Sequence, residues 1–146
     1  MQKLAFLVGK WEGEARVLHG PGQWADLYQT EEVQYRLDGL ILVIEGIGRR
    51  KSDSQPLIQA LAIVSFDDES GTYRMRAFNA GRFLESELEL LNENKAISWD
   101  FALGQVATRS VLRINDSGEW NELAEITVGA EPPKKLIELT VRRIDL

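Results

Sequence analysis

Hydrophobic and polar residues alternate along short segments of this chain, and turn signals separate the segments. The clearest turns are "DG" at 38–39, "NAG" at 79–81 and "NDSG" at 115–118. Alternation with a period of two, in segments rich in Val, Ile, Leu, Thr and aromatic residues, is typical of half-buried strands. We count about ten such segments, and only residues 2–8 favour a short helix. The pattern predicts a single all-β domain over 1–146, a closed antiparallel up-and-down β-barrel with a short N-terminal helix.

Hairpin geometry indicates which side of each strand faces the interior, because directly opposed residues share one face of a sheet. With a turn at 80–81, Arg76 lies opposite Glu85, and Met75 lies on the other, apolar face. The apolar face must point inward. The arginine and the glutamate are therefore predicted to form a surface ion pair rather than an anion site.

The next two hairpins extend the same inner face. A turn at Glu93-Asn94 places Leu88 opposite Trp99, and a turn at 104–105 places Trp99 opposite Ser110. On the outer face the second hairpin pairs an aspartate with an arginine. The inner face stays apolar across all of these strands.

The hairpin at 38–39 carries the strongest turn signal, and its second strand, "LILVIEGIG", is apolar on both faces. A two-residue turn directs Leu37 and Leu40 inward, and it leaves Ile41, Val43 and Ile47 in a row on the outer face. An aliphatic row on the outside of a barrel needs a cover. A homodimer partner and the N-terminal helix are the two candidates.

Polar side chains interrupt the predicted inner face at a few places. Alternation turns Glu31 and Glu122 inward, and a buried carboxylate needs a partner or stays protonated. We predict that Arg143, on the last strand, lies near Glu122. An apolar wall with a few polar groups is typical of a small-molecule cavity. The alternative is a filled barrel whose polar residues satisfy one another. The predicted ligand-binding residues are Gln29, Glu31, Tyr35, Tyr73, Met75, Trp99, Phe101, Ser110, Glu122 and Arg143.

Three functions remain open at this point. The first is binding of a small apolar or amphipathic ligand in the barrel. The second is an enzyme that acts on such a ligand, with Glu31 or Glu122 as the general base, which requires a raised pKa and an open cavity. The third is a ligand-free barrel that binds a protein through the Ile41, Val43 and Ile47 row.

Composition narrows the range of partners. The net charge is -6, and the largest basic cluster is "RRK" at 49–51, which argues against nucleic acid and anionic membranes. There is no cysteine, and the lone His19 has no second ligand nearby in the sequence, so we expect no metal site and no cofactor. The apolar run near the N-terminus is too short for a signal peptide or a membrane span, which predicts a cytoplasmic protein.

One stretch near the N-terminus, "GKWEGEA", places a single large ring among very small side chains. Gly9, Trp11, Gly13 and Ala15 share one face of a strand. We predict that Trp11 points inward and plugs one end of the barrel, while the glycines leave room for the ring and let the strand bend.

Several stretches together resemble a group of bacterial lipocalin-like proteins of the calycin group, which also contains fatty-acid-binding proteins and nitrobindins. These stretches are "FLVGKWEGEA", "YQTEEVQYRLDGLILVIEGIG", "ALAIVSFDDESGTYRMRAF", "GRFLESELELL", "ISWDF" and "EWNELAEITV". The resemblance implies a closed barrel around a ligand cavity. The chain lacks the helical lid of the fatty-acid-binding proteins between its first two strands. It also lacks the C-terminal histidine through which nitrobindins bind haem.

Overall fold

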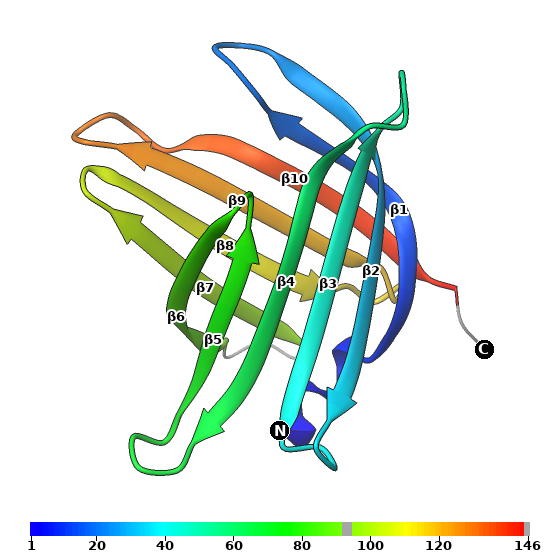
Figure 1. Cartoon of the computed structure of the whole chain (residues 1–146), viewed down its shortest axis with the longest axis vertical. Coiled ribbons are helices and arrows are strands. Elements are labelled where there is room, and N and C mark those ends of the chain that lie inside the picture. The colour runs from blue at the N-terminus through cyan, green and yellow to red at the C-terminus, as the bar shows by residue number, and fades with distance from the viewer. Residues whose placement is uncertain (92–94, 145–146) are drawn as a thin grey trace.

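The computed structural model describes residues 1–91 and 95–144 and forms a closed barrel of ten antiparallel strands (Figure 1). Each strand pairs with its neighbours in sequence, and β10 closes the barrel against β1. A short 3-10 helix, η1, precedes the strands. The sequence therefore predicted the fold class correctly. The elements are η1 (Gln2–Leu7), β1 (Gly9–Leu18), β2 (Trp24–Arg36), β3 (Ile41–Arg50), β4 (Pro56–Asp67), β5 (Thr72–Asn79), β6 (Arg82–Leu90), β7 (Ala96–Leu103), β8 (Val106–Ile114), β9 (Trp120–Val128) and β10 (Lys134–Arg143).

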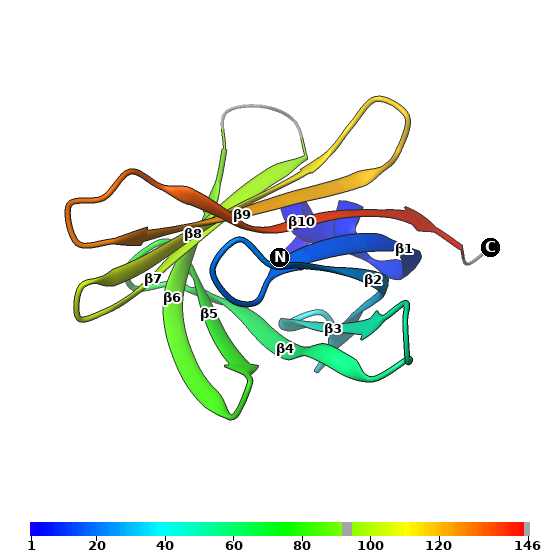
Figure 2. The ribbon, with the colours of Figure 1, turned by 90° about the horizontal axis from the view of Figure 1, so that it is seen from above.

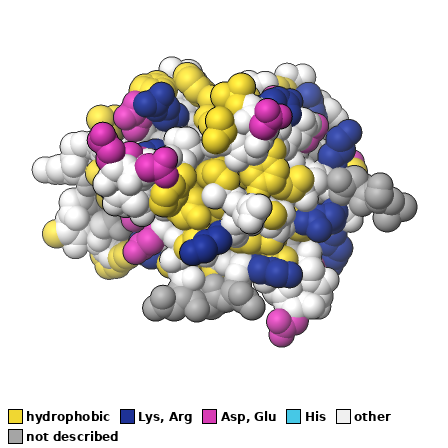
Figure 3. Space-filling view, turned by 90° about the horizontal axis from the view of Figure 1, so that it is seen from below, with side chains coloured by type: hydrophobic (Ala, Val, Ile, Leu, Met, Phe, Trp, Pro, Cys, Tyr) yellow, Lys and Arg dark blue, Asp and Glu magenta, His cyan; other side chains and the backbone are white. Residues whose placement is uncertain are grey.

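Helix η1 closes one end of the barrel. Leu4 and Leu7 are fully buried in the cluster of interior side chains, and the Tyr35 hydroxyl donates a hydrogen bond to the Met1 carbonyl at 2.9 Å. Seen from the opposite end, the helix lies beyond the ring of strands (Figure 2). The helix end itself shows hydrophobic side chains across its middle and charged side chains around them (Figure 3). No helix in the described part of the chain is long and apolar enough to cross a membrane.

The hairpin registers match the predicted ones. Arg76 lies opposite Glu85, with 3.8 Å between the guanidinium and the carboxylate, and both side chains are exposed. Exposed pairs of this kind contribute only about 0–1 kcal/mol. Leu88 pairs with Trp99, and Trp99 pairs with Ser110, as expected. The turn predicted at Glu93-Asn94 lies outside the described residues.

The interior placement of Leu37 and Leu40 was wrong. Both side chains lie in the turn between β2 and β3, and they are 67% and 69% exposed. Leu37 and Asp38 adopt positive φ angles of 54° and 55° there. Strand alternation does not continue through a backbone that turns in this way, so the two leucines leave the inner face although the register of the flanking strands is the predicted one.

Ile41, Val43 and Ile47 are partly buried on the outer face of β3. Helix η1 does not cover this row, because its buried side chains belong to the interior cluster at the closed end. That alternative is therefore wrong. The homodimer, the other candidate for the cover, stays a prediction.

Trp11 fills the closed end of the barrel, as the sequence predicted. Its ring is 1% exposed, its Nε1 donates to the Leu7 carbonyl at 3.0 Å, and its edge meets Trp120 with 5.3 Å between ring centroids. Gly13 is required where β1 closes on β10. A Cβ at this position would lie 2.0 Å from the Thr140 carbonyl oxygen.

Replacing Trp11 by Ala is expected to lower the free energy of unfolding by about 3–5 kcal/mol, because it leaves a cavity between the helix and the barrel. Denaturant unfolding followed by circular dichroism measures this loss. A loss below about 1 kcal/mol would contradict the role of Trp11 as the plug.

Candidate functional site

The interior of the barrel holds a cavity of about 340 Å³. Most of its wall is apolar, with Met75, Leu88, Trp99 and Phe101 among the larger side chains. The cavity extends to the end of the barrel opposite η1. Residues of the β5–β6 and β7–β8 turn regions, including Arg82 and Leu103, form its rim. The interior of the barrel is therefore a cavity, and the alternative of an interior filled by side chains is wrong.

The barrel wall is weakest between β6 and β7. In the described part of the chain their backbone pairing covers Leu88–Leu90 with Ile97–Trp99. Beyond it, Leu84 of β6 and Phe101 of β7 both line the cavity. The Ser86 hydroxyl bridges the two strands there by donating to the Asp100 carbonyl at 2.7 Å. A ligand therefore meets little backbone pairing along this side of the cavity.

Glu31 brings a carboxyl group into the cavity from β2. The side chain is 7% exposed, and the Gln29 Nε2 donates to its Oε2 at 2.8 Å. Gly46 of β3 makes room for the carboxyl, because a Cβ at this position would lie 2.3 Å from Oε2. Gly48 does the same for Gln29, with its added Cβ 2.5 Å from Oε1. Gly46 and Gly48 of β3 therefore provide the space that the Glu31 and Gln29 side chains of β2 occupy. We call these two residues the glycine floor.

Glu122 brings a second carboxyl group into the same cavity from β9. The Trp120 Nε1 donates to its Oε1 at 3.2 Å. The Glu122 side chain lies inside the barrel, and it is partly exposed because it borders the cavity. Trp120 is 1% exposed and is held in turn by its edge contact with Trp11. Trp11, which fills the closed end of the barrel, thus positions the indole N–H that donates to the Glu122 carboxyl.

Burial makes both carboxyl groups costly to ionise, and the charge of Glu122 adds to the cost for Glu31. Burial raises the pKa of Glu122 to about 7, and the hydrogen bond from Trp120 opposes only part of this shift. Burial also raises the pKa of Glu31 well above its usual range, and the negative charge of Glu122 raises it further. The pair can therefore hold or exchange a proton near neutral pH.

Seven of the ten predicted ligand-binding residues line this cavity, and their binding role stays a prediction. They are Gln29, Glu31, Met75, Trp99, Phe101, Ser110 and Glu122. The other three lie elsewhere. Tyr35 ties down the N-terminus through Met1, and the Tyr73 ring packs edge-on against Phe66.

The predicted pairing of Arg143 with Glu122 was wrong. Arg143 is exposed at the closed end, where its guanidinium lies 4.4 Å from the centre of the Trp11 ring and donates to the Phe6 carbonyl at 2.9 Å. The register of β1 and β10 places Arg143 opposite Trp11, so its side chain reaches the plug and not the cavity.

The alternation pattern did not reveal the space at Gly46 and Gly48 or the hydrogen bonds that Gln29 and Trp120 donate to the two carboxyl groups. The pairing of Gln29 with Glu31 had a signal, because residues two apart on a strand share a face. The roles of Gly46 and Gly48 had no such signal, since they depend on which β3 residues lie under the two side chains.

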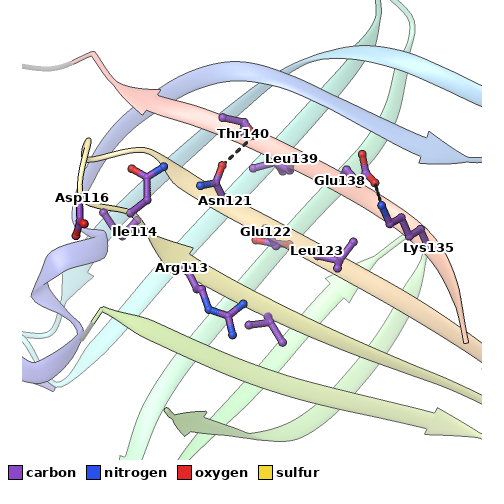
Figure 4. Close-up of a pocket in the computed structure, with 12 residues that line it drawn as sticks. Arg113, Ile114, Asp116, Asn121, Glu122, Leu123, Lys135, Glu138, Leu139 and Thr140 are labelled. Carbon is purple, nitrogen blue, oxygen red and sulfur yellow. Dashed lines mark hydrogen bonds and ion pairs between the residues drawn. The ribbon is translucent and has the colours of Figure 1, made fainter. Parts of the chain in front are cut away.

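A larger, open groove of about 640 Å³ lies on the outer face of β8, β9 and β10 (Figure 4). Two pairs of its polar side chains interact: the Thr140 hydroxyl donates to Asn121 at 3.0 Å, and Lys135 pairs with Glu138 at 2.8 Å. Surface pairing of this kind is a weaker indication of a binding site than the interior cluster. Among the described residues no group of three His, Cys, Asp or Glu side chains could hold a metal ion.

No protein-family model matches the chain, and no curated protein matches it. Among solved structures, the chain is similar to the crystal structure of Rv2717c from M. tuberculosis, with a TM-score of 0.73. The similarity covers 99% of this chain and 96% of that chain at 13% sequence identity. At this identity the similarity shows a shared fold.

Replacing Glu122 by Gln is expected to raise the free energy of unfolding by about 1–3 kcal/mol at about pH 8, because glutamine needs no ionisation in the cavity. It keeps an oxygen that accepts from Trp120. The folded state holds its proton up to a higher pH than the unfolded state, whose carboxyl titrates near 4.5. Wild-type stability should therefore fall as the pH rises from about 4.5 to about 7. The variant should lose the part of this slope that Glu122 contributes, and it should keep the part that comes from the buried Glu31.

Denaturant unfolding at a series of pH values measures both effects. The matched control is Glu125→Gln, on the outer face of the same strand, which should behave like the wild type. Equal pH slopes for the wild type and Glu122→Gln would show that Glu122 ionises freely in the folded protein.

Proposed function

We propose that the protein binds a small, largely apolar molecule inside the barrel, with the polar end of that molecule against Glu31 and Glu122. One observation carries the proposal: among the described residues, the interior is a cavity of about 340 Å³ whose apolar wall contains one cluster of buried ionisable groups, Glu31 and Glu122. Pockets for small molecules combine an apolar lining with a few convergent polar groups in this way. The resemblance to calycin proteins, whose barrels enclose ligand cavities, agrees with it.

An enzyme is the second candidate, and a specific observation favours it. Glu122 borders the cavity, and its pKa of about 7 suits a general base at neutral pH. The hydroxyl groups of Thr108 and Ser110 also line the cavity, but the arrangement does not identify a reaction. Binding therefore ranks first, and the chemical fate of a bound molecule separates the two.

Native mass spectrometry of the protein purified from its own cells is expected to show a retained small molecule that is released on unfolding. Incubating the released molecule with fresh protein and recovering it separates the candidates, since a binding protein returns it unchanged and an enzyme converts it. The same spectra give the oligomeric state, so they also test the predicted homodimer.

The neutral fluorescent probe N-phenyl-1-naphthylamine is expected to bind the wild-type cavity with an increase in emission. Ala124→Phe, which places a ring in the cavity, should weaken this binding at least about tenfold. Ala107→Phe makes the same change on the outer face of β8 and should leave binding unchanged. Equal losses in the two variants, with both folded, would place the probe outside the cavity.

A further inference from the structure

The charged side chains that border the cavity are acidic in its interior and basic at its rim. Among the described residues, the charged ones in its lining are Glu31, Glu122 and Arg82. Arg82 is exposed and begins β6 at the rim, next to the turn with Asn79. Glu31 and Glu122 lie inside the barrel, and Arg143 turns away from them to the outer side of Trp11. The interior therefore contains two acids and no base of its own.

The oxygen atoms of the cluster also outnumber its hydrogen-bond donors. One amide N–H of Gln29 donates to Glu31, and the indole N–H of Trp120 donates to Glu122. The second N–H of the Gln29 amide is the remaining donor of the cluster. Among the described residues, the second oxygen of each carboxyl group has no partner. The Oε1 of Gln29 is buried without a partner as well, in a side chain that is 2% exposed. Among the described residues, three oxygen atoms of the cluster, one on each of Gln29, Glu31 and Glu122, thus have no donor.

Buried acceptors without donors cost free energy, and buried carboxylates cost more. An anionic ligand would add negative charge beside two acids that already resist ionisation, and a neutral hydrocarbon would leave the acceptors unpaired. A cation that carries several N–H groups donates to the unpaired oxygen atoms and balances the negative charge of the carboxylates. An ammonium group has three donors and a compact charge. The side of the cavity with Met75, Trp99 and Phe101 then receives the apolar body.

We propose that the ligand is an amphipathic amine, and that its ammonium group binds between Glu31 and Glu122 while its apolar part lies against Trp99 and Phe101. This inference rests on the proposed function, because it specifies the chemical class that the cavity selects. The glycine floor contributes to the selection. Gly46 lets the Glu31 carboxyl lie close to β3, where both residues line the cavity that receives the head group.

Displacement of N-phenyl-1-naphthylamine by three eight-carbon molecules tests this proposal. Octylammonium, octan-1-ol and octanoate share one chain and differ in their head group. At about pH 8, above the pKa of Glu122, octylammonium is expected to displace the probe at a concentration at least about tenfold lower than octan-1-ol. Octanoate should be the weakest of the three. At about pH 5 the advantage of octylammonium should shrink, because both carboxyl groups take up protons.

The double variant Glu31→Gln and Glu122→Gln should lose the preference for octylammonium while still binding octan-1-ol. Glu125→Gln, with its side chain on the outer face of β9, is the matched control and should keep the preference. Circular dichroism confirms that all variants are folded. A loss of the preference in the double variant alone supports the site between the two acids.

Other results would overturn the proposal. Octylammonium that displaces the probe no better than octan-1-ol, or octanoate that displaces it best, rejects the amine while the cavity keeps its binding function. A preference that survives in the double variant places the ammonium group elsewhere. If neither the probe nor any of the three molecules binds the wild type by calorimetry, the proposed function fails together with the inference.

Discussion

Closure of the sheet between β1 and β10 is the constraint on which the rest of the structure depends. The two strands approach so closely at Gly13 that a Cβ would lie 2.0 Å from the Thr140 carbonyl oxygen. Beside this contact, Trp11 fills the end of the barrel and bonds to the helix through Leu7. A closed barrel has no free edges and encloses a separate interior. Because one end is plugged, that interior becomes a cavity with one open end.

The enclosed space gives the two interior acids their properties. Glu31 and Glu122 would be ordinary surface carboxylates on an open sheet, but inside the barrel burial raises the pKa of each one. The plug and the site are physically linked, since Trp11 packs against Trp120, which donates to Glu122. The stability of the closed end and the chemistry of the cavity therefore share the same side chains. The two acids lower stability near neutral pH, a cost often found at functional sites.

Much of this arrangement could be predicted from the sequence, because turn signals fix hairpin register and register fixes which residues point inward. The paired Arg76 and Glu85, the inward Trp11 and the inward Glu122 all followed from that rule. The rule failed at Leu37 and Leu40, where positive φ angles end the alternation. It also failed for Arg143, whose side chain shares a face with the interior but sits beyond the plug. The space at Gly46 that the Glu31 carboxyl occupies depends on packing between neighbouring strands, and no local sequence pattern indicates it.

The ionisation of Glu122 is the most direct test, because it depends both on the burial of this carboxyl group in the cavity and on the binding of an amine beside it. Carbon-13 NMR of the glutamate carboxyl groups during a pH titration measures it residue by residue. The account predicts that Glu122 titrates near pH 7 in the free protein and at a lower pH when octylammonium is present. A Glu122 that titrates near its ordinary value of 4.5, and does not respond to octylammonium, would contradict the account.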